Sequence, residues 1–255
     1  MIYITGDTHA DYEHRLSTAS FPEQREMTKE DCVIIAGDFG GVWCQPGTKD
    51  CRAEAHQLDA LDRRPFTTLW VPGNHENYDR LMSDEFETKE WHGGQVKVIR
   101  STVLMLMRGE MYEIEGRKFF AFGGAQCHDV DDGILDSEDP DWKEKARHLQ
   151  RTGRYLFRVK GLSWWEQEMP TEEEYQHGRE TLDRQGWQCD FVITHAAPES
   201  LQKKMGIDEE NELSLYLEEI RQKLDYRYWF FGHYHDDGWV TEKDILLYHQ
   251  IVRVT

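Results

Sequence analysis

The chain has 255 residues, of which 38% are hydrophobic and 12% aromatic, so it can bury a sizeable core. Thirty basic against 49 acidic residues give a formal net charge of −19, which argues against binding to long nucleic acids, because that binding needs Lys and Arg to replace counterions. The longest purely apolar runs have five residues, whereas a transmembrane helix needs about 20. We therefore expect a cytoplasmic protein without a membrane span or secretory signal, whose five cysteines are free thiols.

Five short apolar or β-branched runs end at a glycine or at a Thr-His pair, which is typical of strands buried on both faces. In chain order they are residues 2–5, 32–36, 67–71, 191–194 and 228–231. Polar segments such as residues 53–63 separate the first three runs and are long enough for crossover helices. This alternation predicts βαβ units.

The middle of the chain has a different pattern. Residues 96–99, 103–107, 111–114 and 118–122 predict short strands in an antiparallel hairpin series. Residues 128–188 are polar, acidic and rich in tryptophan, and we interpret them as an insert within a single domain of residues 1–255.

Helix signals lie in the insert and after it. Asp139-Pro140 predicts a helix start, and Thr171 with Glu174 predicts a capping box. Leucines and an isoleucine at positions 213, 217, 220 and 224 indicate an amphipathic helix, and residues 245–254 indicate a final strand. The fold class we expect is α/β, with two sheets.

Polar side chains follow each of the five buried strands. Seven of them are nitrogen or oxygen metal ligands: Asp7, His9, Asp38, Asn74, His195, His233 and His235. Ligands of open α/β sheets gather outside the carboxyl ends of strands, where all five turns would lie. If one carboxylate bridges, the seven side chains offer eight bonds, four to each of two ions. This donor set suits Mn, with Fe or Zn as alternatives, and paired ions about 3.5–4 Å apart are typical of phosphoester hydrolysis.

The ordered motifs Gly6-Asp7-Thr8-His9, Gly37-Asp38, Gly73-Asn74-His75-Glu76, Thr194-His195 and Gly232-His233-Tyr234-His235 resemble those of the calcineurin-like metallophosphoesterase superfamily. The resemblance implies two packed mixed β-sheets flanked by helices, a four-layer arrangement, with a dinuclear site at one edge. It implies that one ion is held by Asp7, His9 and His235, and the other by Asn74, His195 and His233, with Asp38 bridging. It also implies that a metal-bridging hydroxide attacks, while His75 contacts phosphate and the leaving oxygen without binding metal.

One departure concerns the second motif. Protein phosphatases of the superfamily have an arginine soon after it, whereas here Asp38 is followed by Phe39-Gly40-Gly41-Val42-Trp43. Protein Ser/Thr phosphatase activity is therefore not expected. We expect a hydrolase of small phosphodiesters or phosphomonoesters. The alternatives are a nuclease or nucleotide phosphodiesterase acting on nucleic-acid ends or cyclic nucleotides, and a catalytically silent scaffold. The partner would be a small phosphoester or a nucleotide, and the oligomeric state stays open.

Four further residues are candidates for substrate contact. His128 and Asp129 follow a glycine turn after a strand and could reach the site. Arg108 is a candidate phosphate clamp, although the pattern favours a solvated charge at a strand end. Trp43 could stack on a base or an aryl leaving group.

Overall fold

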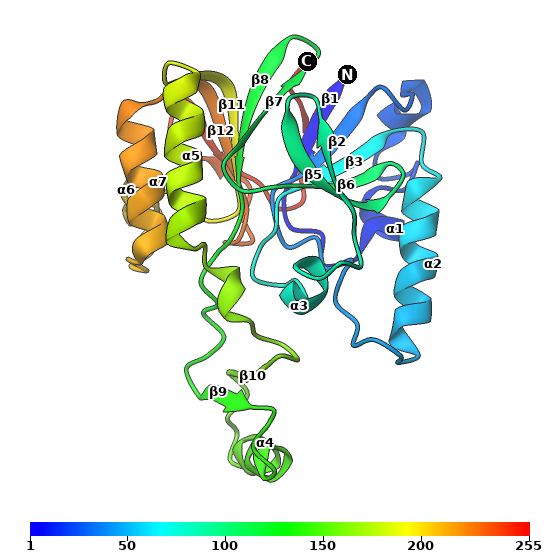
Figure 1. The fold of residues 1–255 in the computed structure, drawn as a ribbon, viewed down its shortest axis with the longest axis vertical. Coiled ribbons are helices and arrows are strands. Elements are labelled where there is room, and N and C mark those ends of the chain that lie inside the picture. Colours follow the sequence, from blue (N-terminus) through cyan, green and yellow to red (C-terminus); the bar gives the residue numbers. More distant parts are fainter.

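A computed structural model describes residues 1–255. Two mixed sheets pack face to face, and helices cover the outer face of each (Figure 1). The first sheet has the order β15-β1-β2-β3-β6-β5-β4, and the second has the order β13-β14-β12-β11-β8-β7. The fold class is α/β, as the sequence predicts, with the four layers of the metallo-dependent phosphatase fold.

The strands of the first sheet are β1 (Ile2–Thr5), β2 (Cys32–Ile35), β3 (Thr67–Trp70), β4 (Thr88–Trp91), β5 (Gly94–Arg100), β6 (Val103–Leu106) and β15 (Ile251–Arg253). Those of the second are β7 (Glu110–Ile114), β8 (Arg117–Phe122), β11 (Gln188–Thr194), β12 (Asp225–Phe231), β13 (Gly238–Trp239) and β14 (Asp244–Leu246). The helices are α1 (Tyr12–Arg15), α2 (Asp50–Asp62), α3 (Tyr78–Leu81), α5 (Glu172–Arg184), α6 (Glu199–Lys204), α7 (Glu212–Lys223) and the 3-10 turn η1 (Pro22–Glu26). No helix is long and apolar enough to cross a membrane.

Three apolar clusters hold these layers together. One fills the space between the sheets and contains Ile4, Ile34 and Phe230 among its 19 buried residues. A second packs α5 and α7 on the outer face of the second sheet, and a third packs α1 and α2 on the outer face of the first. Because β1, β2 and β3 are parallel in one sheet, and β8, β11 and β12 in the other, their carboxyl ends meet at one edge of the molecule.

An arm of residues 128–168 projects from this edge (Figure 1, bottom). It contains β9 (Gly133–Asp136), α4 (Trp142–Arg151), β10 (Phe157–Lys160) and the 3-10 turn η2 (Glu166–Glu168). The projecting segment is shorter than the insert expected over 128–188, because α5 packs into the core of the second sheet through Tyr175 and Leu182. The arm's helix begins at Trp142 rather than at Asp139-Pro140, while the capping box of Thr171 and Glu174 is confirmed.

Two strand predictions need correction. The middle strands do not form one hairpin series, because the chain leaves the first sheet after β6 and enters the second at β7. The single strand predicted over 245–254 is wrong: β14 pairs with β12 in the second sheet, whereas β15 pairs with β1 in the first. Between them the carboxylate of Asp237 accepts hydrogen bonds from the backbone N–H groups of Tyr248, His249 and Gln250, at 2.7–3.1 Å. These donors are therefore unavailable to a sheet, and the chain crosses over.

Candidate active site

The seven side chains predicted as metal ligands come together at the shared edge of the two sheets. Asp7 and His9 follow β1, Asp38 follows β2, Asn74 follows β3, His195 follows β11, and His233 and His235 follow β12. Asp7, Asp38, Asn74, His195 and His233 are buried. His9 and His235 remain partly open, with side chains 32% and 47% exposed. The cluster is therefore reached from solvent on one side only.

One group of donors forms around Asp7. Its Oδ2 lies 3.3 Å from His235 Nε2, and His235 Nε2 lies 3.0 Å from His9 Nε2. Asp38 joins this group, with Oδ2 3.9 Å from His9 Nε2. The ligand atoms of these four residues all lie within 4.8 Å of one another, close enough to coordinate one ion.

A second group forms on the other side of Asp38. Asp38 Oδ1 lies 3.2 Å from His195 Nε2, and the His195 ring lies 4.9 Å from that of His233. His195 Nδ1 is 2.9 Å from the carbonyl oxygen of Ala36, which assigns one ring proton to Nδ1, so Nε2 carries the lone pair when the ring is neutral. His195 Nε2 and Asn74 Oδ1 are buried without a hydrogen-bond partner. Such orphaned acceptors fit a cation, because a buried polar atom without a partner is otherwise costly.

The backbone around these residues is strained in a consistent way. His9, Asp38, His233 and His235 have φ values of 44°, 41°, 73° and 51°, a left-handed region that costs a side-chain-bearing residue about 1–3 kcal/mol. The preceding glycines allow the close approach that the turns need. A β-carbon at Gly73 would lie 2.1 Å from Asp38 Oδ1, and one at Gly232 would lie 2.1 Å from Asp7 Oδ1.

The charges of the centre are strongly coupled. Burial alone would raise the pKa of Asp38, but the charge of His195 beside it holds that pKa well below its usual value. Burial opposes protonation of His195, yet Asp38 and Asp7 raise its pKa to about 9. The hydrogen bond to Asp7 raises the pKa of His235, whereas burial lowers the pKa of His9 and His233. A cation binding here would displace protons from His195 and His235, because only neutral imidazole coordinates a metal.

Comparison with known families identifies the family of the chain. Residues 1–237 match the calcineurin-like phosphoesterase family. The chain belongs to this family. It is therefore a metal-dependent phosphoesterase, and its family implies divalent metal ions, for which the cluster around Asp7 is a candidate site.

One solved structure to which the chain is similar is a phosphopantetheinyl hydrolase from Mycobacterium tuberculosis. It is 17% identical, the match covers 97% of this chain and 87% of that chain, and the TM-score is 0.42. A search of the curated proteins finds no match.

His75 lies beside this phosphoesterase centre. Its backbone N–H donates to Asp38 Oδ1 (2.8 Å), and its ring stacks on Trp43 with centroids 5.8 Å apart. Burial lowers the pKa of His75, and the charge of Asp38 offsets this only in part. Trp43 in turn meets the edge of Trp165 from the base of the arm. His75 is therefore held by the metal-ligand loop on one side and by an aromatic wall on the other.

Of the other residues predicted to contact substrate, His128 and Asp129 lie near the centre and Arg108 does not. The ring of His128 lies 4.7 Å from that of His233, and Asp129 accepts a hydrogen bond from Arg158. Arg108 lies elsewhere: it is buried, and its guanidinium donates to Glu174, Tyr78 and three backbone carbonyls. Because protein groups accept hydrogen bonds from its guanidinium, Arg108 is not available to bind a substrate phosphate.

Sequence reasoning missed three residues that support the centre. Arg15 donates to the backbone carbonyl of Asp7 and to Thr5 Oγ1 (2.9 Å). Glu76 accepts from the N–H of Phe39 (2.8 Å) and so shapes the turn after Asp38, and burial raises its pKa well above the usual value. Tyr248 stacks on His235 at 4.7 Å. Only Glu76 had a sequence signal, because it ends the third motif.

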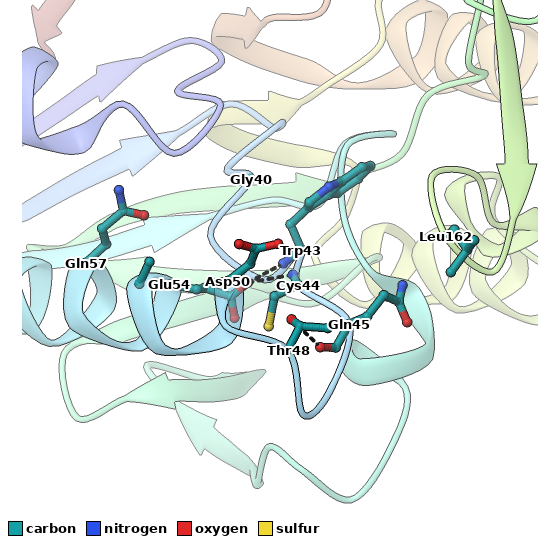
Figure 2. Close-up of a pocket in the computed structure, with 10 residues that line it drawn as sticks. Gly40, Trp43, Cys44, Gln45, Thr48, Asp50, Glu54, Gln57 and Leu162 are labelled. Carbon is teal, nitrogen blue, oxygen red and sulfur yellow. Dashed lines mark hydrogen bonds between the residues drawn. The ribbon is translucent and has the colours of Figure 1, made fainter. Parts of the chain in front are cut away.

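A cavity of about 380 Å³ opens beside Trp43. Its lining comprises Gly40, Trp43, Cys44, Gln45, Thr48, Asp50, Ala53, Glu54, Gln57 and Leu162. Figure 2 shows Leu162, which belongs to the arm, facing this loop from the opposite side. Gly40 connects the cavity to the centre, since a β-carbon there would lie 3.0 Å from the backbone of His9.

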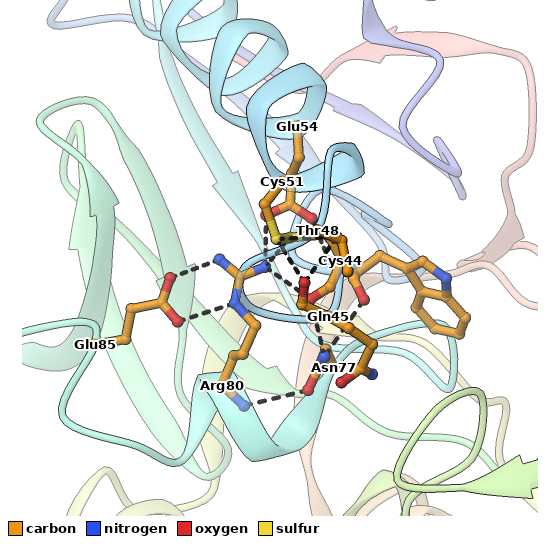
Figure 3. The surroundings of a disulfide bond; sticks show 9 residues. Cys44, Gln45, Thr48, Cys51, Glu54, Asn77, Arg80 and Glu85 are labelled. Carbon is orange, nitrogen blue, oxygen red and sulfur yellow. Dashed lines mark hydrogen bonds and ion pairs between the residues drawn. A yellow bond between two sulfur atoms is a disulfide. The ribbon is translucent and has the colours of Figure 1, made fainter.

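The loop that carries Trp43 is closed by a disulfide between Cys44 and Cys51 (Figure 3). The prediction that all five cysteines are free is therefore wrong for this pair, and holds for Cys32, Cys127 and Cys189. Polar contacts reinforce the loop. Glu54 Oε2 accepts from the N–H groups of Trp43 (2.8 Å) and Cys44 (2.7 Å), and Glu54 Oε1 accepts from Arg80 (2.6 Å).

Proposed function

We propose that the seven side chains hold two divalent ions, with Asp38 between them. One observation carries the proposal: the two carboxylate oxygens of Asp38 face two different donor groups, Oδ2 toward His9 and Oδ1 toward His195. Asp7 and His235 complete the first group, and Asn74 and His233 the second. Imidazole and carboxylate without thiolate suit Mn, with Fe or Zn as alternatives.

The ions would polarise the phosphoryl oxygens and lower the pKa of a water molecule toward neutrality. His75 then acts on the leaving group. Its ring carries at least one N–H, and its place between Asp38 and Trp43 allows it to donate to the departing oxygen without binding a metal. Trp43 fixes the orientation of that ring.

The substrate we propose is a small phosphodiester or phosphomonoester. The cavity beside Trp43 would hold the alcohol part of such an ester, and its volume of about 380 Å³ fits a small group rather than a folded protein surface. Gln45, Thr48 and Gln57 offer hydrogen bonds to a polar alcohol there.

The test combines metal analysis with a substrate panel. Protein stripped with a chelator should be inactive, and titration with Mn²⁺ should restore hydrolysis of nitrophenyl esters as two ions bind per chain. Saturation at zero or one ion would contradict the dinuclear centre. Two bound ions without hydrolysis of any ester on the panel would contradict the enzymatic function instead.

A nucleotide phosphodiesterase is the second candidate. It is favoured by Trp43, whose indole lines the cavity and could stack on a base, an interaction worth about 1–3 kcal/mol. Cyclic nucleotides should then be preferred over alkyl diesters of equal charge, and Trp43→Leu should remove that preference. Equal rates on both substrate types would exclude this candidate.

A further inference from the structure

Arg158, on the arm beside the centre, has N–H donors without a hydrogen-bond partner. It lies on β10 of the arm, its Nη2 donates to the carboxylate of Asp129, and its guanidinium also lies near the thiol of Cys127. Its Nε is buried without a partner, and Nη1 makes no hydrogen bond and reaches solvent, consistent with a side chain that is 20% exposed. Arg15 and Arg108, by contrast, use their guanidinium groups on protein acceptors.

Both legs of the arm contact residues at the centre. The leg of the arm that leaves the body carries His128, whose ring packs on His233. The returning leg carries Trp165, which packs on Trp43 beside His75, and Gly161, whose carbonyl accepts from Gln45 (3.1 Å). Because Arg158 on the returning leg bonds Asp129 on the leaving leg, its guanidinium joins the two legs next to His128.

The charge around Arg158 is incompletely balanced. Glu168 lies near it on the returning leg, but burial raises the pKa of that carboxyl to about 8, so at neutral pH it is mainly protonated. Asp129, 39% exposed, is then the principal counter-charge.

We propose that Arg158 binds a non-bridging oxygen of the phosphate group under attack, on the His75 side of the centre, with Asp129 orienting the guanidinium. The inference rests on the proposed function of that centre. Phosphate oxygens match the planar fork of an arginine, and such charge-assisted pairs are among the strongest hydrogen bonds in proteins. The arm would thus complete the active site.

The experiment compares Arg158→Ala, Arg158→Lys and Arg154→Ala in the full-length Mn²⁺-loaded protein. Arg154 is the matched control: it lies on the same arm, is 64% exposed, and its Nε is 3.9 Å from Asp132. Three quantities are measured: metal content, the Kd for inorganic phosphate by calorimetry, and KM and kcat on nitrophenyl phosphate. Phosphate binding does not require turnover, so it tests Arg158 even if the proposed reaction is wrong.

Arg158→Ala should keep both ions and should raise both the Kd for phosphate and the KM by about 10–100-fold. Arg158→Lys keeps the charge but not the fork, so its Kd should fall between those of wild type and Arg158→Ala, while Arg154→Ala should stay within about twofold of wild type. Wild-type phosphate affinity in a folded, metal-loaded Arg158→Ala or Arg158→Lys protein would overturn the proposal. Equal losses in Arg154→Ala and Arg158→Ala would also overturn it, because they would show that the overall charge of the arm attracts the anion. If Arg158→Ala unfolds, the Lys variant decides.

Discussion

The metal centre and the arm meet at one edge of the molecule but are held in place by different forces. Each proposed ligand lies within a few residues after the end of a strand, and the side chains at that end of the strand are buried. Packing between the two sheets holds several of the turns in left-handed conformations. In the arm, α4 buries only Ala146, and β9 and β10 form a two-stranded sheet of their own. Asp139, Asp132 and Asp129 pair with arm cations in place of a core.

The two regions also differ in charge. The chain carries a net charge of −19, yet residues 142–160 of the arm contain seven basic residues and one acidic residue. A core can fix atoms within fractions of an ångström, whereas surface ion pairs contribute little stability. We therefore expect substitutions in the centre to abolish chemistry and substitutions in the arm to change substrate binding.

Asp38→Ala should have the largest effect. Because this carboxylate faces both donor groups, its loss should release both ions and reduce hydrolysis to the rate of chelator-treated protein. Elemental analysis and steady-state kinetics on one sample measure this. Asp132→Ala, which removes a carboxylate from the arm, should keep two ions. Retention of both ions by Asp38→Ala would refute the bridging role.

His75→Ala should keep the ions and lose about 10²–10⁴ in kcat on alkyl esters, roughly 3–5 kcal/mol of barrier. Nitrophenyl esters need little protonation of the leaving group, so the loss of kcat on these esters should be smaller. His148→Ala, an exposed histidine of α4, is the control and should match wild type. Equal losses on both ester types would leave His75 a phosphate-binding role without a part in leaving-group protonation.

The sequence could locate the candidate ligands at the strand ends, because burial of the strand and close approach at its end both leave a pattern in the residues. A buried strand needs apolar residues, and a glycine must follow where Asp38 or Asp7 approaches the backbone; the pattern around residues 32–38 therefore contains both the strand and its ligand. The strand predicted over 228–231 begins earlier, at Asp225, because the first half of β12 alternates between exposed and buried side chains.

The arm and the long-range contacts could not be predicted in this way. Arg158 is distant from every motif, and its role depends on how two polar legs lie against the body. The bond between Cys44 and Cys51 forms because the start of α2 turns back on the loop after Trp43, and cysteine spacing alone does not show that turn. The break at Tyr248 depends on a carboxylate eleven residues earlier in the chain.

Glu168 provides a pH-dependent test at the base of the arm. Its Oε1 accepts from the N–H of Cys127 (2.7 Å), Oε2 has no partner, and burial raises its pKa to about 8. The folded state then binds more protons than the unfolded state between about pH 4.5 and 8, so stability should fall as pH rises through that window. Wild type should lose on the order of 2–4 kcal/mol of unfolding free energy across this window. Glu168→Gln keeps a carbonyl acceptor but does not titrate, so it should not show this loss.

Denaturant unfolding of chelator-treated protein at pH 5 and pH 8.5 measures this difference. Metal-free protein is used because the charge of bound ions would itself lower the pKa of Glu168. The control is Glu166→Gln, on the same 3-10 turn but exposed, which should leave the pH dependence of wild type unchanged. Parallel stability curves for wild type and Glu168→Gln would show that Glu168 is ionised in the folded protein.

The disulfide beside Trp43 should have the smallest effect, and it tests whether the loop between centre and arm is held by one bond or by several. Closing a chain segment of this length accounts for about 2 kcal/mol in the loop-closure treatment, so Cys44→Ser with Cys51→Ser should lower the free energy of unfolding by that amount. Thiol counting by mass spectrometry first establishes that the wild-type bond is formed. Because Glu54 still accepts from the backbone of Trp43 and Cys44, the indole should keep its place against His75, and KM on small esters should change less than about threefold. A large rise in KM with the ions intact would instead assign the position of Trp43 to the disulfide and would make the active site sensitive to reduction.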